Sequence, residues 1–283
     1  MADQAQNLRD LVGKRQELRV ITVSSGKGGV GKSSISVNLA IAMSKLGVRV
    51  LVVDADFGLA NVDVMLGVTT RYDISHFLRG DRSLGDIIQL GHEGVRFISG
   101  GSGVKDLLDI DEEQLSGLLE GLEHLDRPVD FIIIDTGAGI NDNVVQLVLA
   151  SSETIVVTTP EPTAILDAYA LVKTIVKRDS SHPVHIVVNK CDDKKEAHRV
   201  QEGFIEVVAR HLGKKLNALG IIMYDHDVSQ SIKRQVPITV SHPGSRTSRE
   251  IEQIARDILE LPNDEKPKSV LSKMFKRMLK AES

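Results

Sequence analysis

Several short stretches of this 283-residue sequence are apolar at every position rather than at every second one. Residues 50–53 and 131–134 are the clearest examples. A strand has this pattern when both of its faces are buried, as in a parallel sheet that is covered by helices on both sides. We therefore predict strands at residues 19–24, 48–53, 95–98, 130–135, 154–159, 184–189 and 219–223.

Between these strands the apolar residues recur at helical spacing, as Ile35, Leu39 and Ala42 do. A strand followed by a helix, repeated along the chain, predicts an α/β fold with a doubly wound, mostly parallel sheet flanked by helices. Two prolines within residues 262–267 end this pattern. We expect three parts: an N-terminal segment at 1–17, a domain at 18–261, and a linker with a tail at 262–283. The predicted helices are residues 33–46, 111–125, 163–176, 195–212 and 247–259.

The composition argues against several classes of protein. The net charge is −4, aromatic residues make up 3% and there is no Trp, which disfavours a nucleic-acid surface built on basic residues and base stacking. The single cysteine, Cys191, cannot form an intrachain disulfide or a four-cysteine metal site. Residues 1–17 are polar and no apolar run approaches a membrane span, so the sequence predicts a cytoplasmic protein without a secretory signal.

The strongest motif is the glycine-rich stretch at residues 24–33, Ser-Ser-Gly-Lys-Gly-Gly-Val-Gly-Lys-Ser, between a predicted strand and a predicted helix. It matches the Walker A pattern of P-loop NTPases. Glycines let backbone N–H groups approach phosphates, and the start of the helix adds a favourable dipole. We expect Lys32 to reach the β- and γ-phosphates of a nucleoside triphosphate and the Ser33 hydroxyl to bind Mg²⁺.

A dinucleotide-binding turn is the alternative, because the same glycines also satisfy G-x-G-x-x-G and Asp54 ends the next strand as a ribose partner would. Lys32 and Ser33 favour the nucleoside triphosphate, since a dinucleotide turn does not need them.

Residues 27–33 resemble the deviant Walker A motif of the MinD/ParA ATPases, in which a second lysine stands early in the loop, here Lys27. The resemblance extends over nearly the whole chain. It implies an ATP-dependent homodimer in which Lys27 reaches the phosphates bound by the other subunit, as an arginine finger supplied in trans does. The nucleotide-binding residues that it implies are Gly28, Gly29, Val30, Gly31, Lys32, Ser33, Ser34, Asn189 and Pro237.

Carboxylates follow two predicted strands at the edge where a parallel sheet binds its ligand. Asp135 ends the apolar run 131–134, as in a Walker B motif, where a hard cation needs oxygen ligands. By resemblance, Asp56 positions the attacking water and Asp54 supports the Mg²⁺ region. Gly137 stands where a common form of the family has proline, so this switch loop departs from the family pattern. The expected catalytic residues are Lys27, Lys32, Asp56 and Asp135, and the expected metal ligands are Ser33, Asp54 and Asp135.

The stretch Asn189-Lys190-Cys191-Asp192 is compatible with two bases. By itself it resembles the guanine-reading Asn-Lys-x-Asp motif of GTPases, whereas an asparagine at this strand end contacts adenine in the MinD/ParA family. We expect ATP, because the resemblance of the loop that contains Lys27 to the MinD/ParA motif is stronger evidence than the four-residue match to Asn-Lys-x-Asp. Pro237 lies in a segment that resembles the one closing the family's base pocket.

The two ends of the chain carry further motifs. On a helical wheel at about 100° per residue, the apolar and basic residues of 270–280 separate onto two faces. This indicates a C-terminal amphipathic helix on an anionic membrane surface, the alternatives being a helix packed on the protein itself or a DNA contact. Residues 3–9 resemble the DQAxxLR motif of flagellar-number regulators of the family, which implies contact with the signal-recognition-type GTPase FlhF. The expected partner-binding residues are Asp3, Gln4, Ala5, Leu8 and Arg9, and the expected membrane-facing residues are Val270, Leu271, Met274, Phe275, Met278 and Leu279.

Together these features predict an ATPase that binds ATP and Mg²⁺, forms an ATP-dependent homodimer and attaches reversibly to the inner face of the cell membrane. The resemblance implies that it regulates flagellar number or placement by stimulating FlhF, with Gln4 assisting, and that flagellar switch-complex proteins are further partners. The alternatives are a MinD-type cell-division regulator, a ParA-type DNA-segregation protein and an iron–sulfur carrier on the same fold. Net charge and the apolar face of the tail argue against the second, and the single cysteine argues against the third.

Overall fold

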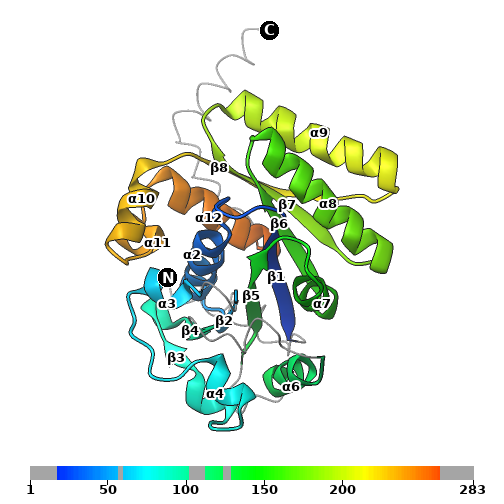
Figure 1. Ribbon diagram of the computed structural model, residues 1–283. Helices are drawn as coiled ribbons and strands as arrows, with labels where there is room; N and C mark the ends of the chain where they lie inside the picture. The colour runs from blue at the N-terminus through cyan, green and yellow to red at the C-terminus, as the bar shows by residue number, and fades with distance from the viewer. Residues whose placement is uncertain (1–17, 57–59, 102–111, 124–128, 262–283) are drawn as a thin grey trace, which may run out of the picture.

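The computed structural model describes residues 18–56, 60–101, 112–123 and 129–261, and the strands of this part form one eight-stranded sheet (Figure 1). They are β1 (Arg19–Ser25), β2 (Val50–Ala55), β3 (Gln89–Leu90), β4 (Arg96–Ile98), β5 (Phe131–Ala138), β6 (Glu153–Thr158), β7 (Val184–Cys191) and β8 (Asn217–Met223). Their order is β3-β4-β2-β5-β1-β6-β7-β8, and all neighbours run parallel except β3, which is antiparallel to β4. The predicted doubly wound α/β fold is confirmed.

β5 shows why the predicted strands are apolar throughout. Phe131 and Ile133 pack in one hydrophobic cluster, whereas Ile132 and Ile134 pack in another. Because successive side chains of a strand point to opposite faces, both faces of β5 are buried. Each of the seven predicted strands overlaps an observed one, but β3 was not predicted, since two residues carry no periodicity.

The five predicted helices are found within two residues of their expected ends, as far as the described residues show. α3, α4, α5, α7, α10 and α11 were missed because four to nine residues are too few to show a clear helical repeat. The helices are α2 (Lys32–Lys45), α3 (Val62–Leu66), α4 (Ile74–Leu78), α5 (Leu84–Ile87), α6 (Glu112–Glu123), α7 (Asp142–Ala150), α8 (Pro162–Arg178), α9 (Lys194–Leu212), α10 (His226–Lys233), α11 (Ile238–Ser241) and α12 (Arg246–Ile258), with a 3₁₀ turn at His92–Gly94.

The long helices form a layer on each face of the sheet. α2 and α12 cover one face and contact each other, while α7, α8 and α9 cover the other (Figure 1). β1 and β2 both run parallel to β5, so the carboxyl ends of these three strands meet at one edge. There, Ser25 of β1 pairs with Ala138 of β5, and Asp54 of β2 with Asp135 of β5. Ligands of doubly wound sheets bind at this edge.

Candidate functional site

The loop between β1 and α2 depends on two glycines. Gly31 precedes α2 with a φ of 94°, a left-handed conformation that glycine adopts without steric cost. A Cβ at this position would lie 2.3 Å from Nδ2 of Asn189. A Cβ at Gly26 would lie 2.2 Å from the backbone carbonyl of Asp167 on α8. The loop is therefore held closely between the end of β7 and the first turns of α8.

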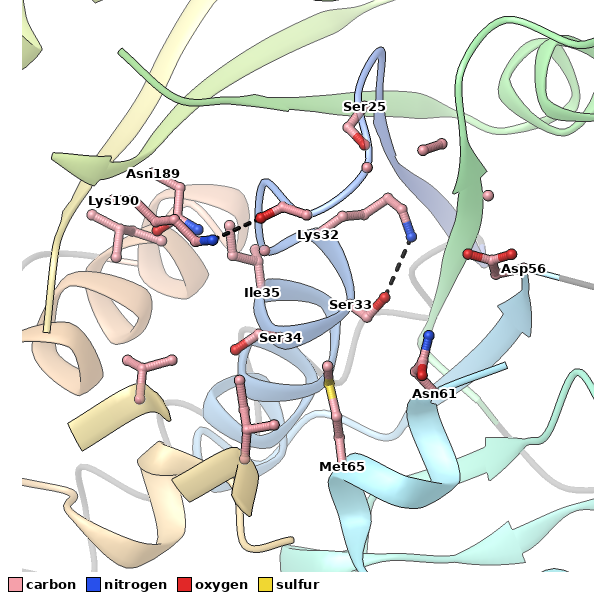
Figure 2. A pocket seen from close by; sticks show the side chains of 18 of the residues that line it. Ser25, Lys32, Ser33, Ser34, Ile35, Asp56, Asn61, Met65, Asn189 and Lys190 are labelled. Carbon is pink, nitrogen blue, oxygen red and sulfur yellow. Dashed lines mark hydrogen bonds between the residues drawn. The ribbon is translucent and has the colours of Figure 1, made fainter. Parts of the chain in front are cut away.

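A cavity of about 890 Å³ opens beside this loop (Figure 2). Its volume lies in the range of small-molecule sites in proteins. Val30 and Pro237 do not line it: Val30 is buried in the core, and Pro237 precedes α11 at a small neighbouring cavity. The predicted nucleotide-binding residues on its wall are Gly28, Gly29, Gly31, Lys32, Ser33, Ser34 and Asn189.

A buried ion pair lies next to the loop. Nζ of Lys32 is 3.1 Å from Oδ1 of Asp135, and the two side chains are 7% and 1% exposed. The Ser36 hydroxyl donates to the same oxygen at 2.9 Å, whereas the other oxygen of Asp135, Oδ2, is buried without a hydrogen-bond partner. An unpaired buried carboxylate oxygen costs free energy, and a hard cation such as Mg²⁺ prefers oxygen ligands. Because Lys32 also lies 3.4 Å from the Ser33 hydroxyl (Figure 2), the residues present fit a metal–nucleotide complex.

Asp54 lies beside Asp135 but is occupied by the backbone of its own loop. Its oxygens accept the N–H groups of Asp56 at 3.1 Å, Asn61 at 2.8 Å and Val62 at 3.0 Å. Burial and the charge of Asp135 raise the pKa of Asp54 to about 7, although these N–H groups lower it. With these partners, Asp54 holds the backbone of the loop that contains Asp56, and its oxygens are not open to a metal ion.

Asp56 and Asn61 face Lys32 and Ser33 across the cavity (Figure 2). Oδ1 of Asp56 lies 3.6 Å from the position that a Cβ on Gly137 would take. The loops that follow β2 and β5 are thus neighbours. Sequence reasoning did not single out Asn61 as a site residue, although it follows Asp56 within the same loop.

Lys27 is placed at the edge of the loop rather than on the cavity wall. Its Nζ donates to Oε2 of Glu161 at 2.8 Å and to the hydroxyl of Thr163 at 2.9 Å, at the start of α8. This hydrogen bond and the charges of Lys27 and Lys190 hold the pKa of Glu161 below its usual value. Since the Lys27 and Glu161 side chains are 38% and 66% exposed, the pair is weak and can exchange its partners.

The end of β7 contacts the opposite side of the loop. Nδ2 of Asn189 donates to the carbonyl of Val30 at 2.8 Å. Nζ of Lys190 donates to the carbonyl of Gly29 at 2.7 Å (Figure 2). Asp192, the last residue of the Asn-Lys-x-Asp match, is exposed and does not line the cavity.

A further wall of the cavity was missed by sequence reasoning. It begins at the end of β8 and continues along α10. The signal was present, because this wall begins at the carboxyl end of a predicted parallel strand, which is where ligands bind. Its residues are Met223, Tyr224, Asp225, Val228, Ser229 and Ile232.

Both terminal motifs, with Asp3–Arg9 at one end and Val270–Leu279 at the other, lie outside the described residues. Within the described part of the chain, no helix has the length and apolar character that crossing a membrane requires. Cys191 is buried, and burial raises the pKa of its thiol to about 12.

Comparison with protein families gives a match over residues 17–259 to the ParA family, described as NUBPL iron-transfer P-loop NTPase. The chain is 34% identical over 268 residues to the antiactivator FleN of Pseudomonas aeruginosa, covering 95% of this chain and 96% of FleN. It is also 34% identical over 287 residues to the flagellum site-determining protein YlxH of Helicobacter pylori, covering 97% and 94% of the two chains.

Solved structures of MinD proteins have the same fold. The chain resembles the septum site-determining protein MinD from Pyrococcus horikoshii complexed with Mg-ADP, with a TM-score of 0.72 and 25% identity over 85% of this chain and 96% of that one. It resembles a chain of the MinC:MinD cell division complex of Aquifex aeolicus with a TM-score of 0.72 and 26% identity, over 88% of this chain and 98% of that one. The first of these MinD proteins thus binds Mg-ADP, and the second forms a complex with MinC.

Proposed function

The chain belongs to the MinD/ParA family of P-loop NTPases, and we propose that it is an ATP-dependent switch ATPase that regulates flagellar number or placement. The similarity to YlxH and FleN over nearly their whole lengths supports the flagellar role. The observation that carries the ATPase role is the buried Lys32–Asp135 pair with its unpartnered Asp135 oxygen. This pair provides a cation for phosphate and an oxygen for a metal next to a glycine-rich loop.

In the proposed reaction, a water attacks the γ-phosphorus, the bond to the bridging oxygen breaks, and ADP and phosphate leave. Lys32 exchanges Asp135 for the β- and γ-phosphate oxygens. Ser33 and Asp135 would hold Mg²⁺, which would supply positive charge to the phosphates. Asp56 orients the water, and Lys27 from the other subunit stabilises charge on the transferred group.

We propose adenine as the base because of the hydrogen bond that Asn189 makes. Its Nδ2 donates to the carbonyl of Val30, which leaves Oδ1, an acceptor, for the base. Adenine presents an N6 amine donor, whereas guanine presents an O6 acceptor. The exposed position of Asp192 outside the cavity also disfavours guanine. In calorimetric titrations we expect ATP to bind at least about tenfold more tightly than GTP, and equal affinities would contradict the assignment.

ATP is proposed to bring two chains together, with Lys27 leaving Glu161 for the phosphates of the other subunit. Two amphipathic tails in one dimer would then bind anionic membrane more strongly than one, through effective concentration. Hydrolysis would reverse this attachment, and the segment at 3–9 would stimulate FlhF. The sequence motifs support these steps.

A substitution at Lys32 tests the nucleotide switch. Because Lys32 is proposed to bind the phosphates, Lys32→Ala should remain monomeric when the wild-type protein dimerises with a non-hydrolysable ATP analogue. Light scattering after size-exclusion chromatography measures the mass. Lys195→Ala, which removes an exposed lysine at the start of α9, is the matched control and should dimerise. A Lys32→Ala dimer formed with ATP would refute the mechanism.

Co-sedimentation with anionic liposomes tests the membrane step. We expect binding with an ATP analogue, but not with a GTP analogue, ADP or no nucleotide, and loss of binding in a chain truncated before residue 268. Binding under every condition would break the proposed link between ATP and the membrane.

Two of the three rival functions have distinct tests. A pull-down that compares binding to FlhF with binding to a division inhibitor separates the flagellar role from MinD-type control of division. A DNA shift assay with ATP tests ParA-type DNA segregation. Iron transfer, which the family description names, is disfavoured by this chain's own cysteine. Cys191 is the single cysteine of the sequence, and burial raises the pKa of its thiol to about 12, which disfavours the thiolate that binds iron.

A further inference from the structure

Lys190, at the end of β7, has a backbone conformation that lysine rarely adopts. Its φ is 57°, in the left-handed region that favours glycine, and it stands next to Asn189 on the cavity wall. Such strain persists only where surrounding contacts enforce it, and it is concentrated at functional sites. The contacts of the Lys190 side chain are with the phosphate loop.

The Lys190 side chain is tied to a residue 161 positions earlier in the sequence. Its ammonium group donates to the carbonyl of Gly29 at 2.7 Å, a charge-assisted hydrogen bond (Figure 2). The adjacent Asn189 donates to the next carbonyl of the loop, that of Val30, at 2.8 Å. Two successive peptide units of the loop are therefore held from the same strand end.

A hydrogen bond that fixes the direction of a peptide carbonyl also fixes the direction of the N–H group in the same peptide unit. A trans peptide is planar, so its N–H points opposite to its C=O. The hydrogen bond to the Gly29 carbonyl therefore sets the direction of the Val30 N–H, and the bond to the Val30 carbonyl sets that of the Gly31 N–H. Successive N–H groups directed to one side form the concave anion site that a phosphate loop needs.

We propose that Lys190 is a positioning residue that shapes the phosphate loop before nucleotide binds, by holding the Gly29 carbonyl away from the phosphates. This inference rests on the proposed nucleotide-binding function. It gives Lys190 a role that acts on the phosphates rather than on the base, although its sequence context resembles a base-reading motif.

The test separates phosphate binding from base binding. Calorimetry would measure the Kd of ATP and of tripolyphosphate, which has no base, for wild type, Lys190→Ala and Lys190→Gly. Because a hydrogen bond to a charged group is lost, both Kd values should rise about tenfold in both variants. Lys195→Ala, an exposed lysine on the following helix, is the control and should bind both ligands as wild type does.

Thermal melting separates this role from a general loss of structure. Glycine relieves the left-handed strain that alanine keeps, so Lys190→Gly should melt above Lys190→Ala and yet bind equally weakly. Recovery of affinity in Lys190→Gly would mean that backbone conformation alone matters, and would overturn the inference.

The other possible results of the calorimetric titrations also test the role of Lys190. Unchanged affinity in Lys190→Ala, or a loss for ATP but not for tripolyphosphate, would overturn the inference and leave the proposed function standing. Failure of the wild-type protein to bind either ligand would overturn the proposed function, and the inference with it.

Discussion

Gly31 stands where backbone conformation and packing both exclude other residues, since its φ is 94° and a Cβ would lie 2.3 Å from Nδ2 of Asn189. Gly31→Ala should displace Asn189 and weaken ATP binding by at least about tenfold, because the hydrogen bond to the Val30 carbonyl is lost with it. Calorimetry measures this change. Gly203→Ala is the control: it lies in α9, where a Cβ would meet nothing within 4 Å. If Gly31→Ala bound ATP normally, the close packing of the loop would be unimportant.

Glu161 offers a second prediction at the residue scale, because it holds Lys27 within the same chain. Glu161→Gln should leave the unfolding free energy of the wild-type protein unchanged, since exposed ion pairs contribute little to stability. It should also lower the protein concentration at which ATP produces dimers, because Lys27 is released for the other subunit. Analytical ultracentrifugation measures this midpoint. Glu206→Gln, which breaks the exposed pair with Arg210 on α9, should leave it unchanged. A raised midpoint in Glu161→Gln would show that Glu161 favours the dimer instead.

At the scale of elements, two adjacent aspartates after β7 have different roles. Both are exposed, but Asp193 caps α9, where its Oδ1 accepts the N–H of Glu196 at 2.8 Å. Asp193→Ala should lower the unfolding free energy by about 1 kcal/mol, as removal of an N-cap does. Urea denaturation measures this loss. Asp192→Ala should change neither stability nor the preference for ATP over GTP, and a shift in that preference would restore the guanine-reading interpretation.

At the scale of the whole molecule, the edge opposite the cavity joins distant parts of the chain. Arg19 at the start of β1 donates to the carbonyl of Ile258 at the end of α12, at 2.9 Å. On the same edge, Nε2 of His182 lies 2.8 Å from the hydroxyl of Thr154, at the start of β6. Burial lowers the pKa of His182 below its usual 6.5, so the folded protein disfavours its charged form.

The sign of the resulting pH dependence follows from proton uptake. Below pH 6.5 the unfolded chain binds a proton at His182 that the folded chain does not, so the unfolding free energy should fall as the pH decreases from 6.5 through the folded pKa. Urea denaturation at several pH values measures this slope. His182→Gln should flatten it, whereas substitution of the exposed His198 should not. An unchanged slope in His182→Gln would contradict the assignment.

The α/β fold and the phosphate loop could be predicted from the sequence alone, because both depend on local patterns. Strands buried on both faces must be apolar throughout, as residues 131–134 are, and a phosphate loop needs its glycines, Lys32 and Ser33 within a few positions of one another. β3 carried no such pattern and was missed.

Contacts between residues far apart in the sequence could not be predicted and became evident from the folded structure. The pairing of β2 with β5 places Asp54 beside Asp135, and the packing of β7 against the loop brings Lys190 to the Gly29 carbonyl. The wall after β8 was not predicted, and Pro237 lies at a neighbouring cavity, for the same reason: their positions depend on how α10 packs on α11 and α11 packs on α2. Hydrogen bonds and ion pairs act over a few ångströms, so contacts between residues far apart in the chain exist only once the fold has brought them together.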